Sequence, residues 1–143
     1  MNLMRDVAGY PGLRIDSGGV VWNGKKRMPT TNVQDRHGVS MLAIYTGDDF
    51  VPIWDIMSNA FYDGGLILPR DGNFFNCHKS GIVEVKHVSF DVITDTDDIR
   101  WIWWMYCRGL RCSEILEATK WSDKFRVDDI KNVVRDVLVQ GIR

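Results

Sequence analysis

Hydrophobic and polar positions follow short alternating runs through the first half of the chain, and glycines separate these runs. Leu13–Ile15 and Val20–Trp22 flank turn-forming residues, which predicts a β-hairpin. Met41–Tyr45 and Phe50–Ile53 are arranged in the same way around a second turn and predict a second hairpin. The first half is therefore expected to be built from short antiparallel strands.

The spacing of apolar residues changes to a helical period after the second hairpin. A short helix is predicted there, and its apolar face consists of Ile53, Ile56, Met57, Ala60 and Phe61. Apolar runs at residues 81–85 and 87–90 then predict two further strands.

Helical spacing dominates the C-terminal third. A first helix is expected to start within residues 94–98, where short oxygen-bearing side chains and acids suit a helix N-terminus, and to end at Gly109. Ser113 is the predicted cap of a second, short helix. A third helix is predicted to begin near Ser122 or Asp123. Its apolar positions are Val127, Ile130, Val133, Val134, Val137 and Leu138.

Three tryptophans, Trp101, Trp103 and Trp104, surround the first of these helices. Two short helices cannot bury all three, so at least one indole is expected to face the β-rich part or a partner chain. The predicted fold class is α+β, with a β-rich region over residues 1–92 and a three-helix region over residues 93–143. No flexible linker separates the regions, so they can pack together.

Composition narrows the class of protein. The 143 residues carry a net charge of −1, which disfavours a strong nonspecific binder of polyanions. No apolar run reaches the roughly 20 residues of a membrane span, and residues 1–6 lack a signal-peptide core. A cytoplasmic protein without membrane contact is expected. The three cysteines have no framework spacing, which favours reduced thiols, and no cofactor or metal is predicted.

The helical region has the pattern of a helix-turn-helix unit. Residues 100–115 combine a helix, a glycine turn and a Ser-Glu-Ile helix start, and such units present the next helix to the DNA major groove. The polar residues assigned to the third helix as DNA contacts are Lys124, Arg126, Lys131, Asn132 and Arg135. The alternative is a three-helix bundle with a solvated charged face, on which Asp128, Asp129 and Asp136 would repel phosphate.

The segment Leu68–Asn76, with the turn Asp71-Gly72-Asn73, resembles the core of the HNH homing endonuclease family found in phages. Residues 6–22 resemble a short module that often precedes such cores. Residues 51–61 resemble the helix before the catalytic turn, although relatives often have histidine where Trp54 stands. The resemblance covers roughly residues 6–85.

The resemblance does not extend to the catalytic histidine of the family. The family places its catalytic histidine two residues before the Asp-Gly-Asn turn, and Pro69 occupies that position. Proline can neither accept a proton from water nor bind a divalent cation. A nuclease-dead relative is therefore expected, with no catalytic residue. The alternative is an active nuclease in which His78 is a displaced base.

These observations favour a sequence-specific protein that binds double-stranded DNA and represses transcription by occupancy. Candidate phosphate contacts lie in the early loops, at Lys25, Lys26, Arg27 and Arg36. The protein can also act as a homodimer, in which two helix-turn-helix units would contact half-sites about one DNA turn apart. The second alternative is a protein-interaction module that uses the tryptophan-rich helix to inhibit a host or phage factor.

Overall fold

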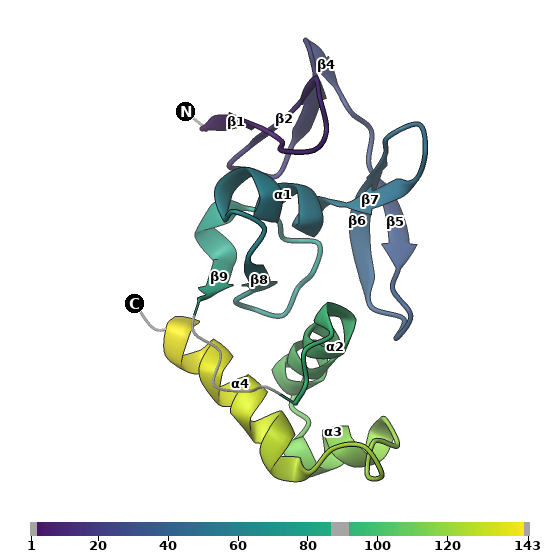
Figure 1. The fold of residues 1–143 in the computed structure, drawn as a ribbon, viewed down its shortest axis with the longest axis vertical. Helices are drawn as coiled ribbons and strands as arrows, with labels where there is room; N and C mark the ends of the chain where they lie inside the picture. The colour runs from purple at the N-terminus through teal and green to yellow at the C-terminus, as the bar shows by residue number, and fades with distance from the viewer. Residues whose placement is uncertain (1–2, 87–91, 142–143) are drawn as a thin grey trace.

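The computed structural model describes residues 3–86 and 92–141, and within them three small antiparallel sheets precede three helices (Figure 1). The first sheet contains β1 (Met4–Asp6), β2 (Leu13–Asp16), β3 (Val21–Asn23) and β4 (Lys26–Arg27). The second sheet contains β5 (Thr31–Gln34), β6 (Ser40–Tyr45) and β7 (Phe50–Pro52). The third pairs β8 (Leu66–Pro69) with β9 (Ile82–Val85).

The helices fall into two groups. Helix α1 (Ile53–Phe61) follows β7 directly, and one 3-10 turn, η1 (Lys79–Gly81), precedes β9. The C-terminal helices are α2 (Thr96–Cys107), α3 (Cys112–Ala118) and α4 (Val127–Gly141). This arrangement confirms the predicted α+β class. Among the described residues, no helix is both long enough and apolar enough to cross a membrane.

Most predicted strands are present. Both hairpins are confirmed as β2–β3 and β6–β7, and the helix predicted after the second hairpin is α1. The basic run was expected in a loop, but Lys26 and Arg27 form β4, because the chain turns at Gly24 and pairs back onto β3. The strand predicted at residues 87–90 lies outside the described residues.

Two predicted helix starts are wrong. The second helix begins at Cys112 and not after Ser113, because the Glu114 carboxylate accepts the N–H of Arg111 at 3.0 Å and closes the helix there. The third helix begins at Val127 and not near residue 122. The preceding chain forms a separate turn in which the indole of Trp121 packs against Phe125.

The β-rich region and the helices share one hydrophobic core. Helix α2 packs against β8, and α4 packs against β9. The indole N–H of buried Trp103 donates to the carbonyl of Pro69 at 2.6 Å, so one tryptophan of α2 faces the β-rich part as predicted. Strand β9 ends at Val85 and α2 begins at Thr96, and the helices pack on the β-rich region through this shared core.

A polar contact fixes the β5–β6 turn to the start of α2. Asp98 is only 3% exposed, and its carboxylate accepts a hydrogen bond from Arg36. His37 Nε2 lies 2.7 Å from the same carboxylate oxygen, and its ring stacks on Trp101 at 5.5 Å. Arg36 also pairs with Asp95 at 3.1 Å. Because these partners are far apart in sequence, the contact stabilises the tertiary arrangement.

Replacing Asp98 with alanine should lower the free energy of unfolding by about 1–3 kcal/mol, because two donors lose their shared acceptor. Urea denaturation at neutral pH measures the change. The control is Asp48→Ala, which removes an exposed turn carboxylate and should stay within about 0.5 kcal/mol of wild type. Equal losses in the two variants would contradict a stabilising role for the Asp98 contact.

Candidate nucleic-acid interface

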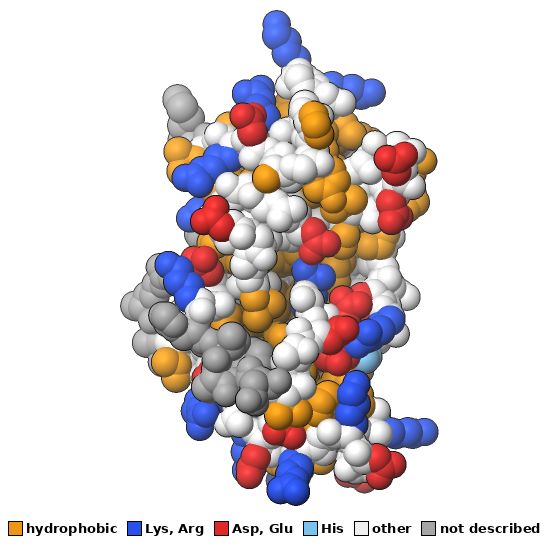
Figure 2. Space-filling model, in the orientation of Figure 1, with side chains coloured by type: hydrophobic (Ala, Val, Ile, Leu, Met, Phe, Trp, Pro, Cys, Tyr) orange, Lys and Arg blue, Asp and Glu red, His pale blue; other side chains and the backbone are white. Residues whose placement is uncertain are grey.

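Apart from Arg36 in the β5–β6 turn, the candidate DNA contacts fall into two groups at opposite ends of the molecule. Strand β4, which contains Lys26 and Arg27, lies at the top of Figure 1, and Lys25 lies in the turn before it. Helices α3 and α4 occupy the lower end. Figure 2 shows Lys and Arg side chains at both ends of the visible face, with acidic side chains among them. One duplex can contact both groups only by running along the length of the molecule.

Helix α4 has one buried and one exposed face. Its buried side chains are Ile130, Val133, Val134 and Val137. Lys131 and Arg135 are exposed one turn apart, and half-buried Asn132 lies beside them. The amide oxygen of Asn132 accepts a hydrogen bond from Arg135 Nη2 at 2.9 Å. The structure therefore brings three predicted contacts together on the exposed face of α4.

Lys124 and Arg126 precede α4, so the prediction that they lie on this helix is wrong. The backbone N–H groups of Lys124 and Phe125 both donate to the carbonyl of Trp121, and this turn delays the helix start. Both cationic side chains are exposed at the N-terminal end of α4. That position suits contact with phosphate better than contact with base edges.

The cations near α4 differ from Arg36 in their pairing. Among the described residues, no salt bridge involves the side chains of Lys124, Arg126, Lys131 or Arg135. Arg36 pairs with two carboxylates, and its hydrogen bond with Asp98 raises the pKa of the guanidinium although burial opposes this. The positive charge of Arg36 is thus neutralised locally.

Acidic residues at the start of α4 modify this charge. The carboxylate of Asp129 accepts the backbone N–H of Arg126 at 2.8 Å, so one acid stabilises the helix terminus. Asp128 is exposed one turn before Lys131 and Asn132. The face is consequently mixed at its N-terminal end, and in its middle Lys131 and Arg135 are exposed with half-buried Asp136 next to them.

The tight glycine turn joins α2 to α3. Gly109 ends α2 as predicted and has φ +93°, and only residues 108–111 separate the two helices. The loop before α4 is longer. Helix α3 exposes Glu114 and Glu117 and is therefore poorly suited to approach phosphate. Helix α4 is the better candidate for DNA contact.

The polar side chains of the HNH-like turn form local hydrogen bonds. Asp71 accepts the N–H of Asn73 at 2.9 Å, and Asn73 accepts the N–H of Phe75 at 3.1 Å. Such bonds are the usual reason for Asp and Asn in turns. His78 Nδ1 accepts the N–H of Ser80 at 3.2 Å and caps η1. Each of these side chains has a structural role.

Helix α2 covers this turn from one side. A Cβ atom on Gly72 would lie 2.3 Å from the Cβ of Cys107, and Arg108 donates to the Gly72 carbonyl at 3.1 Å. On the other side of the loop, the indole of Trp54 donates to the carbonyl of Phe74 at 2.8 Å. Trp54 thus fixes the loop through a buried hydrogen bond.

In the part of the chain that the structure describes, no three His, Cys, Asp or Glu side chains group together as a metal site. His87 lies outside the described residues. Comparison of the chain with protein-family models, curated proteins and solved structures finds no match.

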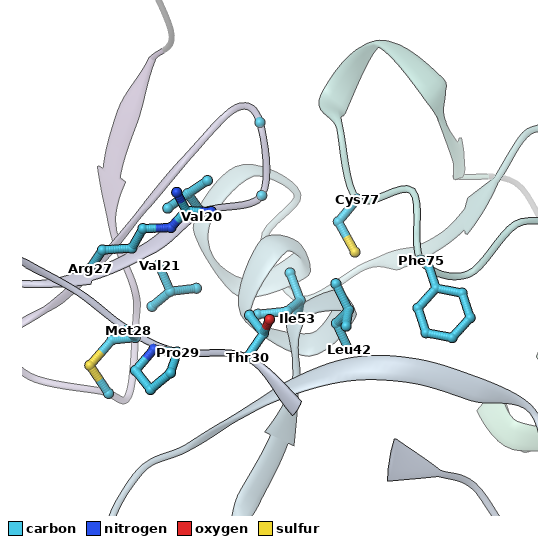
Figure 3. Close-up of a pocket in the computed structure, with 12 residues that line it drawn as sticks. Val20, Val21, Arg27, Met28, Pro29, Thr30, Leu42, Ile53, Phe75 and Cys77 are labelled. Carbon is cyan, nitrogen blue, oxygen red and sulfur yellow. The ribbon is translucent and has the colours of Figure 1, made fainter. Parts of the chain in front are cut away.

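Sequence reasoning missed a surface groove of about 450 Å³ beside the HNH-like loop (Figure 3). It lies between the β2–β3 turn, the segment that follows β4, and the loop containing Phe75 and Cys77. The sequence feature that could have indicated this groove is the pair Phe74-Phe75, because two adjacent loop residues cannot readily both point into the core. Phe74 is buried, whereas Phe75 is 45% exposed.

The packing of α2 on the Asp71-Gly72-Asn73 turn can be tested by a substitution at Gly72. Gly72→Ala should destabilise the protein by about 1–3 kcal/mol more than Gly38→Ala, because overpacking against Cys107 adds to the cost of the left-handed backbone. Gly38 has a similar φ of +87° with no neighbour within 4 Å of an added Cβ. Equal losses in urea denaturation would show that α2 does not cover the turn.

Proposed function

We propose that the protein binds double-stranded DNA at a specific sequence through α4 and represses transcription by occupancy. The observation that carries this proposal is the group of exposed cations on and just before α4 that lack carboxylate partners among the described residues. Unpaired, exposed cations on one helix are what phosphate and base edges require. The proposed location is the cytoplasm of a bacterial cell that carries a phage or mobile element.

The division of α4 into two faces supports the mode of contact. Its buried valines and isoleucine fix the helix on the core, so the opposite face is presented rigidly to solvent. Arg135 suits a guanine edge, and Asn132 suits an adenine edge. Lys124 and Arg126 suit flanking phosphates at the N-terminal end of the helix. This set replaces the contiguous helix of contacts predicted from residue 124 to residue 135.

Lys25 and Lys26 are proposed as phosphate contacts of a duplex that runs lengthwise along the molecule. Arg36 is left out of the proposed set, because Asp95 and Asp98 already neutralise it. A homodimer would place two α4 helices on half-sites about one DNA turn apart. Titration to saturation then gives two copies per duplex.

We further propose that the protein descends from an HNH homing endonuclease and no longer cleaves DNA. Pro69 stands at the position of the base, and the side chains of Asp71 and Asn73 are engaged in turn hydrogen bonds. The loop that would carry the chemistry is instead fixed by tryptophans and covered by α2. These features support a loop retained for structure.

Single replacement of Lys131 or Arg135 with alanine should weaken binding to the cognate duplex by about 1–3 kcal/mol for a base contact, as fluorescence anisotropy measures. The duplex is taken from the fragment that the tagged protein enriches from genomic DNA. Lys86→Ala is the control, because Lys86 is also exposed but follows β9 and pairs with Glu84. Unchanged affinity in both α4 variants would overturn α4 as the interface.

Incubation of the same duplex with the protein and Mg²⁺ should leave the DNA intact, because no histidine occupies the position of Pro69. Denaturing electrophoresis detects nicks in either strand. Cleavage that disappears in His78→Ala would contradict the proposal and establish a displaced base. Absence of any duplex affinity at low salt would contradict DNA binding itself and favour the protein-interaction alternative.

A further inference from the structure

The groove beside the HNH-like loop has opposite chemistry at its two ends. Figure 3 shows Arg27 at one end and the ring of Phe75 at the other, with Thr30, Leu42 and Ile53 between them. Its volume of about 450 Å³ falls within the roughly 300–1,000 Å³ of small-molecule sites. A ligand that fits must therefore be charged at one end and apolar or aromatic at the other.

The charged end selects an anion. Arg27 is exposed, and among the described residues it forms no salt bridge. Lys25 and Lys26 precede it in the sequence, and the twelve lining residues include no carboxylate. A guanidinium without a carboxylate partner suits the phosphate of a nucleic-acid strand.

The other end offers an aromatic surface. Phe75 is 45% exposed, although its neighbour Phe74 is fully packed in the core. The loop is held in place by the indole of Trp54, which bonds the carbonyl of Phe74. The ring of Phe75 is therefore presented on a fixed backbone, which lowers the entropic cost of stacking a planar ligand on it.

The wall between the two ends is preformed. Gly19 has φ +85°, and an added Cβ would lie 2.8 Å from the Cβ of Cys77, so the β2–β3 turn packs directly on the loop. Burial raises the pKa of the Cys77 thiol to about 12, so the sulfur that faces the groove is neutral at physiological pH. The hydroxyl of Thr30 is the polar group beside this apolar wall.

We propose that this groove binds one unpaired nucleotide of a nucleic-acid strand, with its base stacked on Phe75 and its phosphate paired with Arg27. The charge pattern favours a strand over an uncharged small molecule, and stacking on one ring does not require a particular base. The site is separate from α4, so it adds a single-stranded contact to the proposed duplex contact.

The test is a titration of the full chain with fluorescent ten-nucleotide oligo(dT) in low salt, followed by anisotropy. Phe75→Ala should weaken binding by roughly 5- to 150-fold, the range for loss of one stacked base, and Phe75→Trp should restore it. Arg27→Gln should reduce the slope of log K against log salt by about 0.7, the value for one phosphate on a single strand. Because both side chains are exposed, circular dichroism should show unchanged folding.

Phe50→Ala is the matched control, because Phe50 is 51% exposed on β7 and does not line the groove. It should bind oligo(dT) as wild type does. Equal losses in the Phe50 and Phe75 variants would overturn the proposal, as would absence of oligo(dT) binding by the wild-type protein.

The Lys131→Ala/Arg135→Ala double variant separates this proposal from the proposed function. It should lose duplex affinity and keep oligo(dT) affinity. If it loses oligo(dT) affinity while the groove variants keep theirs, the strand binds at α4 and the groove proposal is overturned. If wild type binds oligo(dT) in the groove but never binds duplex, the groove proposal stands and the proposed function fails.

Discussion

Two indole N–H groups fix the end of β8 and the loop that follows it, and this segment joins α1 and α2. Trp103 of α2 donates to the carbonyl of Pro69, and Trp54 of α1 donates to the carbonyl of Phe74. Both indoles are buried, so each N–H needs its acceptor, and each acceptor would be costly to leave unpaired. The loop therefore determines where α2 lies against the β-rich region.

The Asp71-Gly72-Asn73 turn has a clear structural role in this arrangement. A turn of Asp, Gly and Asn folds by its own hydrogen bonds, whatever chemistry it carries. Gly72 also permits the close approach of Cys107, since a side chain there would collide with α2. The turn residues thus have packing reasons to be present, and their presence alone does not indicate catalysis.

The charges of the protein are divided between structure and surface. Arg36 and Arg100 each pair with carboxylates and join distant segments, at Asp98 and at Asp55 respectively. The cations near α4 and on β4 are exposed without such partners among the described residues. The net charge is near zero because these exposed cations lie among acidic side chains at both ends of the molecule.

The sequence by itself determined the local elements. Alternation and helical spacing gave the hairpins, α1 and the three C-terminal helices, because these patterns reflect which side of each element is buried. Helix starts at Cys112 and Val127 were missed, since they depend on capping by Glu114 and on the packing of Trp121. The exposed face of α4 followed from the same spacing, except that Leu138, which was assigned to the apolar face, is 41% exposed.

Only the tertiary structure decided which polar residues are available for binding. Arg36 and Lys131 look alike in the sequence, yet Arg36 is neutralised by carboxylates that lie about sixty positions away, and Lys131 is not. The groove between Arg27 and Phe75 is likewise lined by segments that are far apart in the sequence. Ion pairs and grooves of this kind form between segments that are distant in the sequence. A local pattern of residue types therefore cannot predict them.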